Sequence, residues 1–282
     1  MASEFFIPDT VQKAIKIKEE TKKTFFLGGG TTLNSWTKNT GSKNLISLRK
    51  LGLKNIARKN GYIYIDSGVT MTEMTKNPIL SDNLPLSEIV KSCHIVSKNI
   101  RNMATVGGII ASRYTRSDFI PLFLVLDAEI LYESPDGEHL DPIDEYYENP
   151  PSKTMLIKQL VLKENHEPFF FKSKRYARSS NDLPIIKVAV LFRPEGVAMK
   201  NIRIAVGGLY EKSMRLYELE KLLEGKDYTD TDLRKIISEK LNEMPPARND
   251  FRGSGDFRKS LVSAFLEDIL TSAVKGDSVE WK

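Results

Sequence analysis

Two glycine-rich segments constrain this chain of 282 residues more than any other feature of its sequence. The first, Leu27–Asn34, reads Leu-Gly-Gly-Gly-Thr-Thr-Leu-Asn, and the second, Arg101–Ser112, contains Thr105, Gly107 and Gly108. Adjacent glycines let backbone N–H groups approach an anion closely, and threonines beside them add hydroxyl donors. A single glycine triplet is also typical of a plain turn. The pair together predicts two loops that grip one phosphate-bearing cofactor.

Two familiar phosphate-binding patterns are missing from the sequence. It contains no G-x-x-x-x-G-K-[ST], and neither segment reads G-x-G-x-x-G at the head of a βαβ unit. The second segment leads into Phe119–Leu126, which is apolar enough for a buried strand or helix. A third glycine pair, Gly207–Gly208, has no threonine next to it, so it predicts a turn more than a phosphate loop.

The composition is that of a soluble globular protein, with 40% hydrophobic and 28% charged residues. No stretch of about 18 apolar residues could span a bilayer, and the N-terminus has no secretory pattern, so we expect no membrane insertion and a cytoplasmic location. The net charge of +5 comes from lysines and arginines scattered along the chain. It favours solubility over nucleic-acid binding.

The chain has one cysteine, Cys93, and three histidines, His94, His139 and His166. A cysteine-ligated iron–sulfur cluster takes about four thiolates, so any cluster must belong to a partner chain. The histidines have no metal-ligand spacing, and we expect no bound metal. Cys93 shares one helical face with Leu86 and Ile89, which predicts a core residue.

Helical and strand patterns alternate along the chain and predict an α+β protein. We expect two domains, residues 1–165 and 166–282, because polar residues take over around Lys163–Pro168. The predicted elements are a strand at 5–8, a helix from Val11 capped by Asp9 or Thr10, strands at 44–48 and 63–66, helices from Thr70 and over 84–96, strands at 129–133 and 155–162, a helix over 183–192, a strand at 202–206, and helices from about 229 and 256. The surface loop at 149–152 and a mobile tail from Gly276 complete the prediction.

Several motifs, taken in order, resemble one family. They are Leu27–Leu33, Ile100–Gly108, Ser117–Asp118, Leu126–Glu129, Phe169–Phe170 with Lys174, Arg178 and Asp182, Arg203–Gly208 with Glu220 and Gly225–Lys226, and Asp250–Arg258. Together they resemble the FAD-binding subunit of the molybdenum hydroxylases, the xanthine dehydrogenase and carbon monoxide dehydrogenase flavoprotein group. The resemblance runs from Pro8 to about Leu270.

The resemblance implies a fold and a cofactor. The fold is a vanillyl-alcohol-oxidase-like (PCMH-type) FAD-binding domain of two α+β lobes, followed by a smaller α+β domain of the carbon monoxide dehydrogenase flavoprotein type. FAD would lie between the two lobes. The cofactor-binding residues that it implies are Leu27, Gly28, Gly29, Gly30, Thr31, Thr32, Leu33, Asn34, Thr105, Val106, Gly107, Gly108, Ile109, Asp118, Leu162 and Lys174.

Two of these residues have an alternative role, and two others differ from the residue that is usual in the family. Asp118 would accept a hydrogen bond from a cofactor hydroxyl, but it is also typical of a helix N-cap before Phe119. Lys174 would place positive charge near the reduced flavin, or be a solvated surface lysine. Ile109 stands where the family usually has asparagine, so it offers its backbone N–H without an amide contact. Thr32 stands where aspartate or serine is common.

The implied function is electron transfer within a three-component hydroxylase. An iron–sulfur subunit would pass electrons to the FAD of this chain, a molybdopterin-binding subunit would oxidise the substrate, and NAD is an expected acceptor. No catalytic residue is expected in the chain itself, because the flavin carries the chemistry. A stand-alone FAD oxidoreductase of the same fold is the alternative. From another class, the basic run Lys172–Arg178 is also compatible with nucleic-acid binding.

Overall fold

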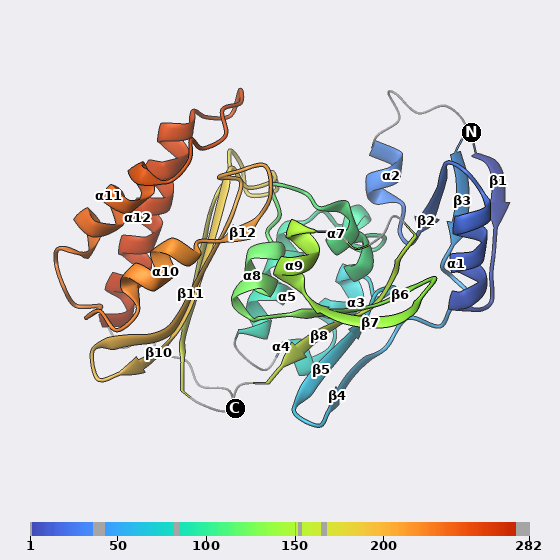
Figure 1. Ribbon diagram of the computed structural model, residues 1–282, viewed down its shortest axis with the longest axis horizontal. Coiled ribbons are helices and arrows are strands. Elements are labelled where there is room, and N and C mark those ends of the chain that lie inside the picture. Colours follow the sequence, from blue (N-terminus) through green and yellow to red (C-terminus); the bar gives the residue numbers. More distant parts are fainter. Residues whose placement is uncertain are drawn as a thin grey trace. The chain divides into compact units, whose positions relative to one another are not determined.

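The computed structural model describes residues 2–35, 43–81, 85–149, 151, 154–164 and 168–274 (Figure 1). The chain divides into two compact units, and each is described by itself. Unit 1 comprises Met1–Ser81, Val96–Arg113 and Asp127–Lys163, and unit 2 comprises Asp82–Ile95, Tyr114–Leu126 and Glu164–Lys282. Both units combine helices with sheets, so the predicted α+β class is confirmed. The domain boundary at residue 165 stays a prediction about the sequence.

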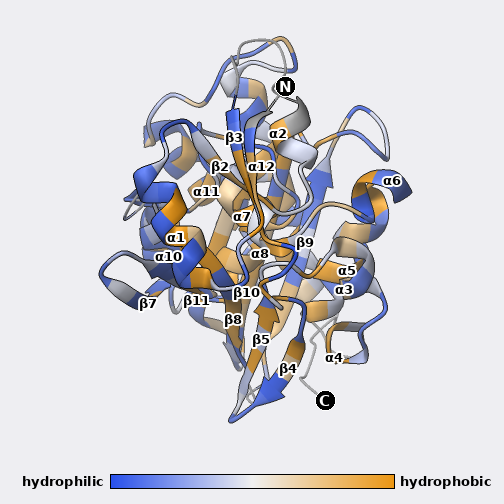
Figure 2. Cartoon of the chain, turned by 90° about the vertical axis from the view of Figure 1, so that its right-hand side faces the viewer, coloured by the Kyte–Doolittle hydropathy of each residue, from blue (hydrophilic) through white to orange (hydrophobic). Residues whose placement is uncertain are grey.

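Unit 1 contains a small parallel sheet that leads into the first glycine segment. Its strands are β1 (Ala2–Phe6), β3 (Lys43–Ser47) and β2 (Thr24–Leu27), in that spatial order. Helix α1 (Val11–Glu20) begins at the predicted cap, where the Thr10 hydroxyl accepts a hydrogen bond from the Lys13 backbone N–H over 3.2 Å. Its apolar and polar residues are seen in Figure 2, and Ala14 and Ile15 bury the apolar side. Strand β2 lies at one edge of this sheet and delivers the chain to Gly28.

The rest of unit 1 is built on a five-stranded antiparallel sheet. Its spatial order is β4 (Ile56–Lys59), β5 (Tyr62–Asp66), β8 (Leu156–Lys163), β6 (Glu129–Ser134) and β7 (Gly137–Pro142). The helices of this unit are short: α2 (Thr31–Ser35), α3 (Met71–Thr75), α4 (Pro78–Ser81), α6 (Lys98–Arg101), α7 (Val106–Ser112) and α9 (Ile143–Glu148). The predicted helix from Thr70 begins in a capping box, because Thr70 and Glu73 exchange hydrogen bonds.

Unit 2 is a four-stranded antiparallel sheet covered by helices. The strands follow the order β12 (Met214–Arg215), β11 (Ala198–Gly207), β10 (Ile186–Glu195) and β9 (Phe170–Tyr176). The helices are α5 (Leu86–Ile95), α8 (Ile120–Val125), α10 (Tyr217–Leu223), α11 (Leu233–Glu243) and α12 (Gly255–Val274). In Figure 1, α10 and α12 cover one face of this sheet and α8 lies against the other. The central strands are therefore covered on both faces.

One predicted element of unit 2 is wrong. The predicted helix over 183–192 is strand β10, in which the seven residues from Ile186 to Phe192 are all buried. A strand covered on both faces is apolar at almost every position, so it lacks the alternation that marks a half-buried strand. Its β-branched residues, Ile186, Val188 and Val190, fit the strand.

The other predicted elements overlap helices or strands of the structure, although the strand predicted at 5–8 is β1, which ends at Phe6. The run Phe119–Leu126, expected to be a strand or a helix, contains α8, and Cys93 is buried on α5 as predicted. The loop at 149–152 and the tail from Gly276 lie partly or wholly outside the described residues. Of the helices that the structure describes, none has the length and apolarity needed to cross a membrane.

Candidate cofactor site

The first glycine segment follows the edge strand β2 and is shaped by contact with the second segment. A Cβ on Gly28 would lie 2.9 Å from the Thr105 hydroxyl oxygen, and a Cβ on Gly29 would lie 1.5 Å from the Met103 carbonyl oxygen. Gly30 has φ of 72°, a left-handed conformation that glycine adopts without strain. Glycine is thus required here because two stretches of backbone touch.

The second segment is held in place by its own cap and by a neighbouring strand end. Thr105 is the N-cap of α7, and its hydroxyl oxygen accepts a hydrogen bond from the Gly108 N–H over 3.2 Å. The Gly107 N–H donates to the Ser67 carbonyl over 2.8 Å, and a Cβ on Gly107 would lie 2.7 Å from the Ser67 Cβ. These contacts fix α7 against the end of β5.

The two segments line one cavity of about 650 Å³, within the usual range for small-molecule sites. Its walls come from the end of α1, strand β2, both glycine segments, α9 and the approach to β8. The lining residues are Lys18, Glu19, Thr21, Lys22, Lys23, Thr24, Phe25, Phe26, Gly28, Gly29, Gly30, Thr31, Thr32, Leu33, Thr105, Gly108, Ala111, Ser112, Tyr146, Thr154 and Met155. The cavity thereby brings together half of the residues expected at the cofactor: Gly28, Gly29, Gly30, Thr31, Thr32, Leu33, Thr105 and Gly108.

Lys18 supplies a half-buried positive charge to this cavity. Its ammonium nitrogen lies 5.2 Å from the centre of the Phe25 ring and 5.8 Å from that of Phe26, and it donates to the Thr24 carbonyl. Burial lowers the pKa of Lys18 from its ordinary value. Neither glycine segment lining the cavity carries a basic residue between Gly28 and Leu33 or between Thr105 and Gly108. Three lysines line the cavity, and Lys18 is the partly buried one, whereas Lys22 and Lys23 are exposed.

A smaller cavity of about 110 Å³ shares Gly28, Thr105 and Gly108 with the first. Ser67 lines it, and the Ser67 hydroxyl is buried with no hydrogen-bond partner among the described residues. A buried hydroxyl normally has a partner. The donor set of the two cavities is suited to the diphosphate of FAD. It consists of the Ser67 hydroxyl, the threonine hydroxyls and the Lys18 ammonium, next to backbone at which only glycine fits.

Asp118 lies in unit 2, where its carboxylate is buried and ion-paired. Its side chain is 5% exposed, and one carboxylate oxygen accepts from the Arg175 Nε over 2.9 Å. Burial raises the pKa of Asp118, and the charges of Arg175 and Lys187 oppose that rise. Asp118 is not the N-cap of α8, because Phe119 holds that position, and the Ser117 hydroxyl accepts from the N–H groups of Phe119 and Ile120.

The candidates Ile109, Leu162 and Lys174 are not among the residues that line the two cavities. Leu162 is buried in β8 opposite Ile63, and Lys174 in β9 is ion-paired with Asp268. The Ile109 N–H, expected to be available to the cofactor, instead donates to the Thr105 carbonyl over 2.9 Å in the first turn of α7. The side chain of Asn34 lies outside the described part of the chain.

Lys18 and Ser67 are site residues that the sequence did not identify. The sequence pattern could have indicated Lys18, because this residue continues the apolar face of α1 at the spacing set by Val11, Ala14 and Ile15. A lysine on an apolar face either extends to solvent or has a partner. Ser67 follows strand β5 with no distinguishing pattern around it.

Unit 1 has two sheets, and its two glycine segments line a cavity that is suited to a cofactor. Comparison with known proteins identifies the class of cofactor-binding domain. Residues 1–164 match the family described as the FAD binding domain in molybdopterin dehydrogenase, and residues 171–273 match the CO dehydrogenase flavoprotein C-terminal domain. The chain belongs to this family of molybdenum hydroxylase flavoproteins. It is an FAD-binding medium subunit of an oxidoreductase, and FAD is its cofactor.

Individual relatives match along nearly their whole length. The glyceraldehyde dehydrogenase medium chain of Sulfolobus acidocaldarius is 27% identical over 271 residues, which are 90% of this chain and 92% of that protein. The xanthine dehydrogenase FAD-binding subunit of Escherichia coli O157:H7 is 25% identical over 276 residues, 94% of each. A chain of the solved carbon monoxide dehydrogenase from Hydrogenophaga pseudoflava that lacks the Mo-pyranopterin moiety has a TM-score of 0.88 at 21% identity, covering 98% of both chains. This last likeness concerns the fold.

Proposed function

We propose that this chain transfers electrons within a molybdenum hydroxylase, from an iron–sulfur partner subunit to an acceptor such as NAD. The observation that carries the proposal is the contact between the two glycine segments, which line a cavity of about 650 Å³ together with Lys18. When bound, FAD exchanges one or two electrons, which suits a link between one-electron clusters and a two-electron acceptor. The chain's single cysteine leaves any cluster to a partner.

The residues of the cavity have separate tasks in this proposal. The glycines let backbone approach the diphosphate, and the hydroxyls of Thr31, Thr105 and Ser67 are available as donors. Lys18 compensates the negative charge, because charge-assisted hydrogen bonds are stronger than neutral ones. Contact of FAD with Asp118, Leu162 or Lys174 stays a prediction that direct binding data must test.

The structure gives no support to the nucleic-acid alternative. In the basic run Lys172–Arg178, Lys174 is ion-paired with Asp268, Arg175 with Asp118, and Arg178 with Asp182. Phosphate binding would have to compete with each of these carboxylates. The run is better explained as a set of intramolecular ion pairs.

The proposal is tested on the tagged chain purified from its source cells with whatever subunits accompany it. We expect flavin absorbance bands, a copurifying chain with iron–sulfur absorbance, and bleaching of the flavin when NADH is added without oxygen. The isolated chain should retain FAD but oxidise no hydroxylase substrate by itself. Substrate-dependent bleaching of the isolated chain, without any cluster-bearing companion, would instead favour a stand-alone oxidoreductase.

A further inference from the structure

The loop that precedes α12 holds an aromatic side chain in solvent. Phe251 is 80% exposed, more than any other large hydrophobic residue that the structure describes. Exposed aromatic side chains on ordered backbone are typical of protein interfaces, where they act as anchors.

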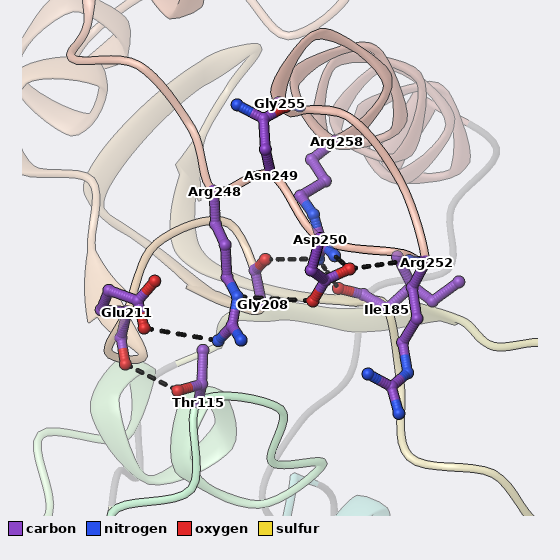
Figure 3. Close-up of polar contacts among 10 residues, drawn as sticks. All are labelled: Thr115, Ile185, Gly208, Glu211, Arg248, Asn249, Asp250, Arg252, Gly255 and Arg258. Atoms are coloured by element: carbon purple, nitrogen blue, oxygen red, sulfur yellow. Dashed lines mark hydrogen bonds and ion pairs between the residues drawn. The ribbon is translucent and has the colours of Figure 1, made fainter.

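Hydrogen bonds within the loop fix its shape (Figure 3). One Asp250 carboxylate oxygen accepts from the Arg252 N–H over 2.8 Å and from Arg258 Nη2 over 2.7 Å, and Asn249 accepts from the Gly255 N–H over 2.7 Å. Arg258 is fully buried and also donates to the carbonyls of Ile185 and Gly208, over 2.9 and 2.7 Å. The loop is thereby tied to the end of β10 and to the turn after β11.

The charge beside Phe251 is positive and incompletely paired. Arg252 lies with its guanidinium 3.9 Å from the centre of the Phe251 ring, and in Figure 3 it extends away from Asp250. The Nε of Arg252 and the Nη1 of Arg116 are buried atoms with no hydrogen-bond partner among the described residues. A buried guanidinium N–H without an acceptor is costly. Both residues are partly exposed, so a carboxylate of a partner bound beside them would supply the negative charge that the two guanidinium groups lack.

Arg116 belongs to the same surface because its segment is joined to the loop. The preceding Thr115 accepts from the Gly208 N–H over 2.9 Å and donates its hydroxyl to the Glu211 carbonyl over 2.7 Å, while the Glu211 carboxylate pairs with Arg248 (Figure 3). Burial and the charge of Arg252 lower the pKa of Arg116, as expected for two neighbouring guanidinium groups. The charges of Asp182 and Asp250 act on Arg116 in the opposite direction, but Arg178 pairs with Asp182, and Arg258 and Arg248 share the Asp250 carboxylate.

We propose that Arg116, Phe251 and Arg252 form a docking surface, the anchor surface, for an acidic segment of the partner subunit on which the proposed function rests. Phe251 fills an apolar pocket of the partner, and carboxylates of the partner pair with the two arginines. Charge complementarity favours an acidic partner over a second copy, since this chain carries a net charge of +5. The ordered loop reduces the entropy lost on docking.

The test compares the anchor surface with a similar pair elsewhere in unit 2. Tyr217 is 45% exposed, and Arg215 lies 4.7 Å from its ring centre, but Arg215 is paired with Glu220 over 2.8 Å. Tagged wild-type chain and the variants Phe251→Ala, Arg252→Glu and Tyr217→Ala are purified from source cells, and the affinity for the cluster-bearing subunit of the wild-type complex is titrated. We expect at least a tenfold loss for Phe251→Ala and Arg252→Glu, and none for Tyr217→Ala.

Two measurements distinguish the loss of a docking contact from misfolding of the variant and from failure of the proposed function. Retention of FAD in unit 1 and unchanged hydrogen exchange of β10 show that a variant is folded, and hydroxyl-radical footprinting of the wild-type complex should protect Phe251. A complex that assembles equally well with the variants, or that leaves Phe251 open to oxidation, overturns the anchor surface while the electron-transfer proposal stands. Self-association through Phe251, or the absence of any companion chain, overturns the proposal that the occupant is an acidic segment of a partner subunit. Loss of FAD from the wild-type chain would count against the proposed function instead.

Discussion

The pairs Gly28–Gly29 and Gly207–Gly208 have the same sequence but opposite surroundings. Gly28 and Gly29 touch the second glycine segment and border a cavity. Gly208 has φ of 86°, its carbonyl accepts from the buried Arg258, and a Cβ there would lie 2.1 Å from the Ile185 carbonyl oxygen. The first pair leaves room for a ligand, while protein fills the space beside the second.

The difference shows that adjacent glycines alone do not define a phosphate site. What distinguishes the first pair is that the hydroxyl-bearing segment facing it and Lys18 border an open cavity. Beside the second pair, Arg258 donates to the Gly208 carbonyl and the Ser213 hydroxyl lies against Gly207, so protein groups fill the space and the predicted turn is what the structure contains. The following substitutions test whether the two pairs have separate roles in cofactor binding and in stability.

The largest effect on the cofactor is expected from Gly29→Ala. The new Cβ would overlap the Met103 carbonyl oxygen at 1.5 Å, so the two segments must separate. We expect FAD affinity to fall by at least about 100-fold, equivalent to about 2.7 kcal/mol, measured by quenching of flavin fluorescence. Gly61→Ala is the control, because a Cβ there meets nothing although φ is 76°. Tight FAD binding by the Gly29 variant would show that the contact between the segments is dispensable.

Gly208→Ala should lower the stability of unit 2 and leave the FAD affinity nearly unchanged. The clash with the Ile185 carbonyl and the left-handed backbone together should destabilise the sheet of unit 2 by about 2–3 kcal/mol. Hydrogen exchange of the β10 and β11 amides measures this as a lower free energy of opening. FAD affinity should stay within about twofold of wild type, a change below about 0.5 kcal/mol. A loss of FAD as large as that of Gly29→Ala would mean that the two glycine pairs do not act separately.

Lys18→Met tests the charge that accompanies the first pair. Loss of a charge-assisted contact of about 1.5–3 kcal/mol should weaken FAD binding about 10- to 100-fold. Riboflavin, which has no phosphate, should bind the variant and the wild type equally. Lys22→Met is the matched control, since Lys22 also lines the cavity but is exposed. An equal loss for riboflavin would assign Lys18 to packing rather than to the diphosphate.

The sequence predicted those parts of the molecule that have a local cause. Thr10 and Thr70 cap helices, and the glycine segments are recognisable because close approach of backbone requires glycine. Strand β10 was mistaken for a helix because its covering on both faces is a tertiary property. The Asp118–Arg175 ion pair joins residues that are far apart in sequence, and no pattern around Asp118 indicates its partner. Lys18 could be placed on the apolar face of α1, but only the fold shows that this face ends at the cavity.

The smallest predicted effect is on the pH dependence of FAD affinity. It distinguishes a contribution from the charge of Lys18 from a contribution of the size of its side chain. Burial already lowers the pKa of Lys18 below its ordinary value of 10.5 in the chain without cofactor, and a bound diphosphate raises it again. FAD affinity should therefore be full below the pKa of the free chain and should decline as the pH rises through it, because binding then requires proton uptake. Lys18→Arg should remove this decline, since the guanidinium stays charged up to about pH 12, and any titration of the flavin itself remains visible in that variant. Parallel pH profiles for the wild type and Lys18→Arg would show that the ammonium of Lys18 does not interact with the cofactor phosphates. The distinction between the two glycine pairs would then depend on the cavity and the hydroxyl donors beside the first pair.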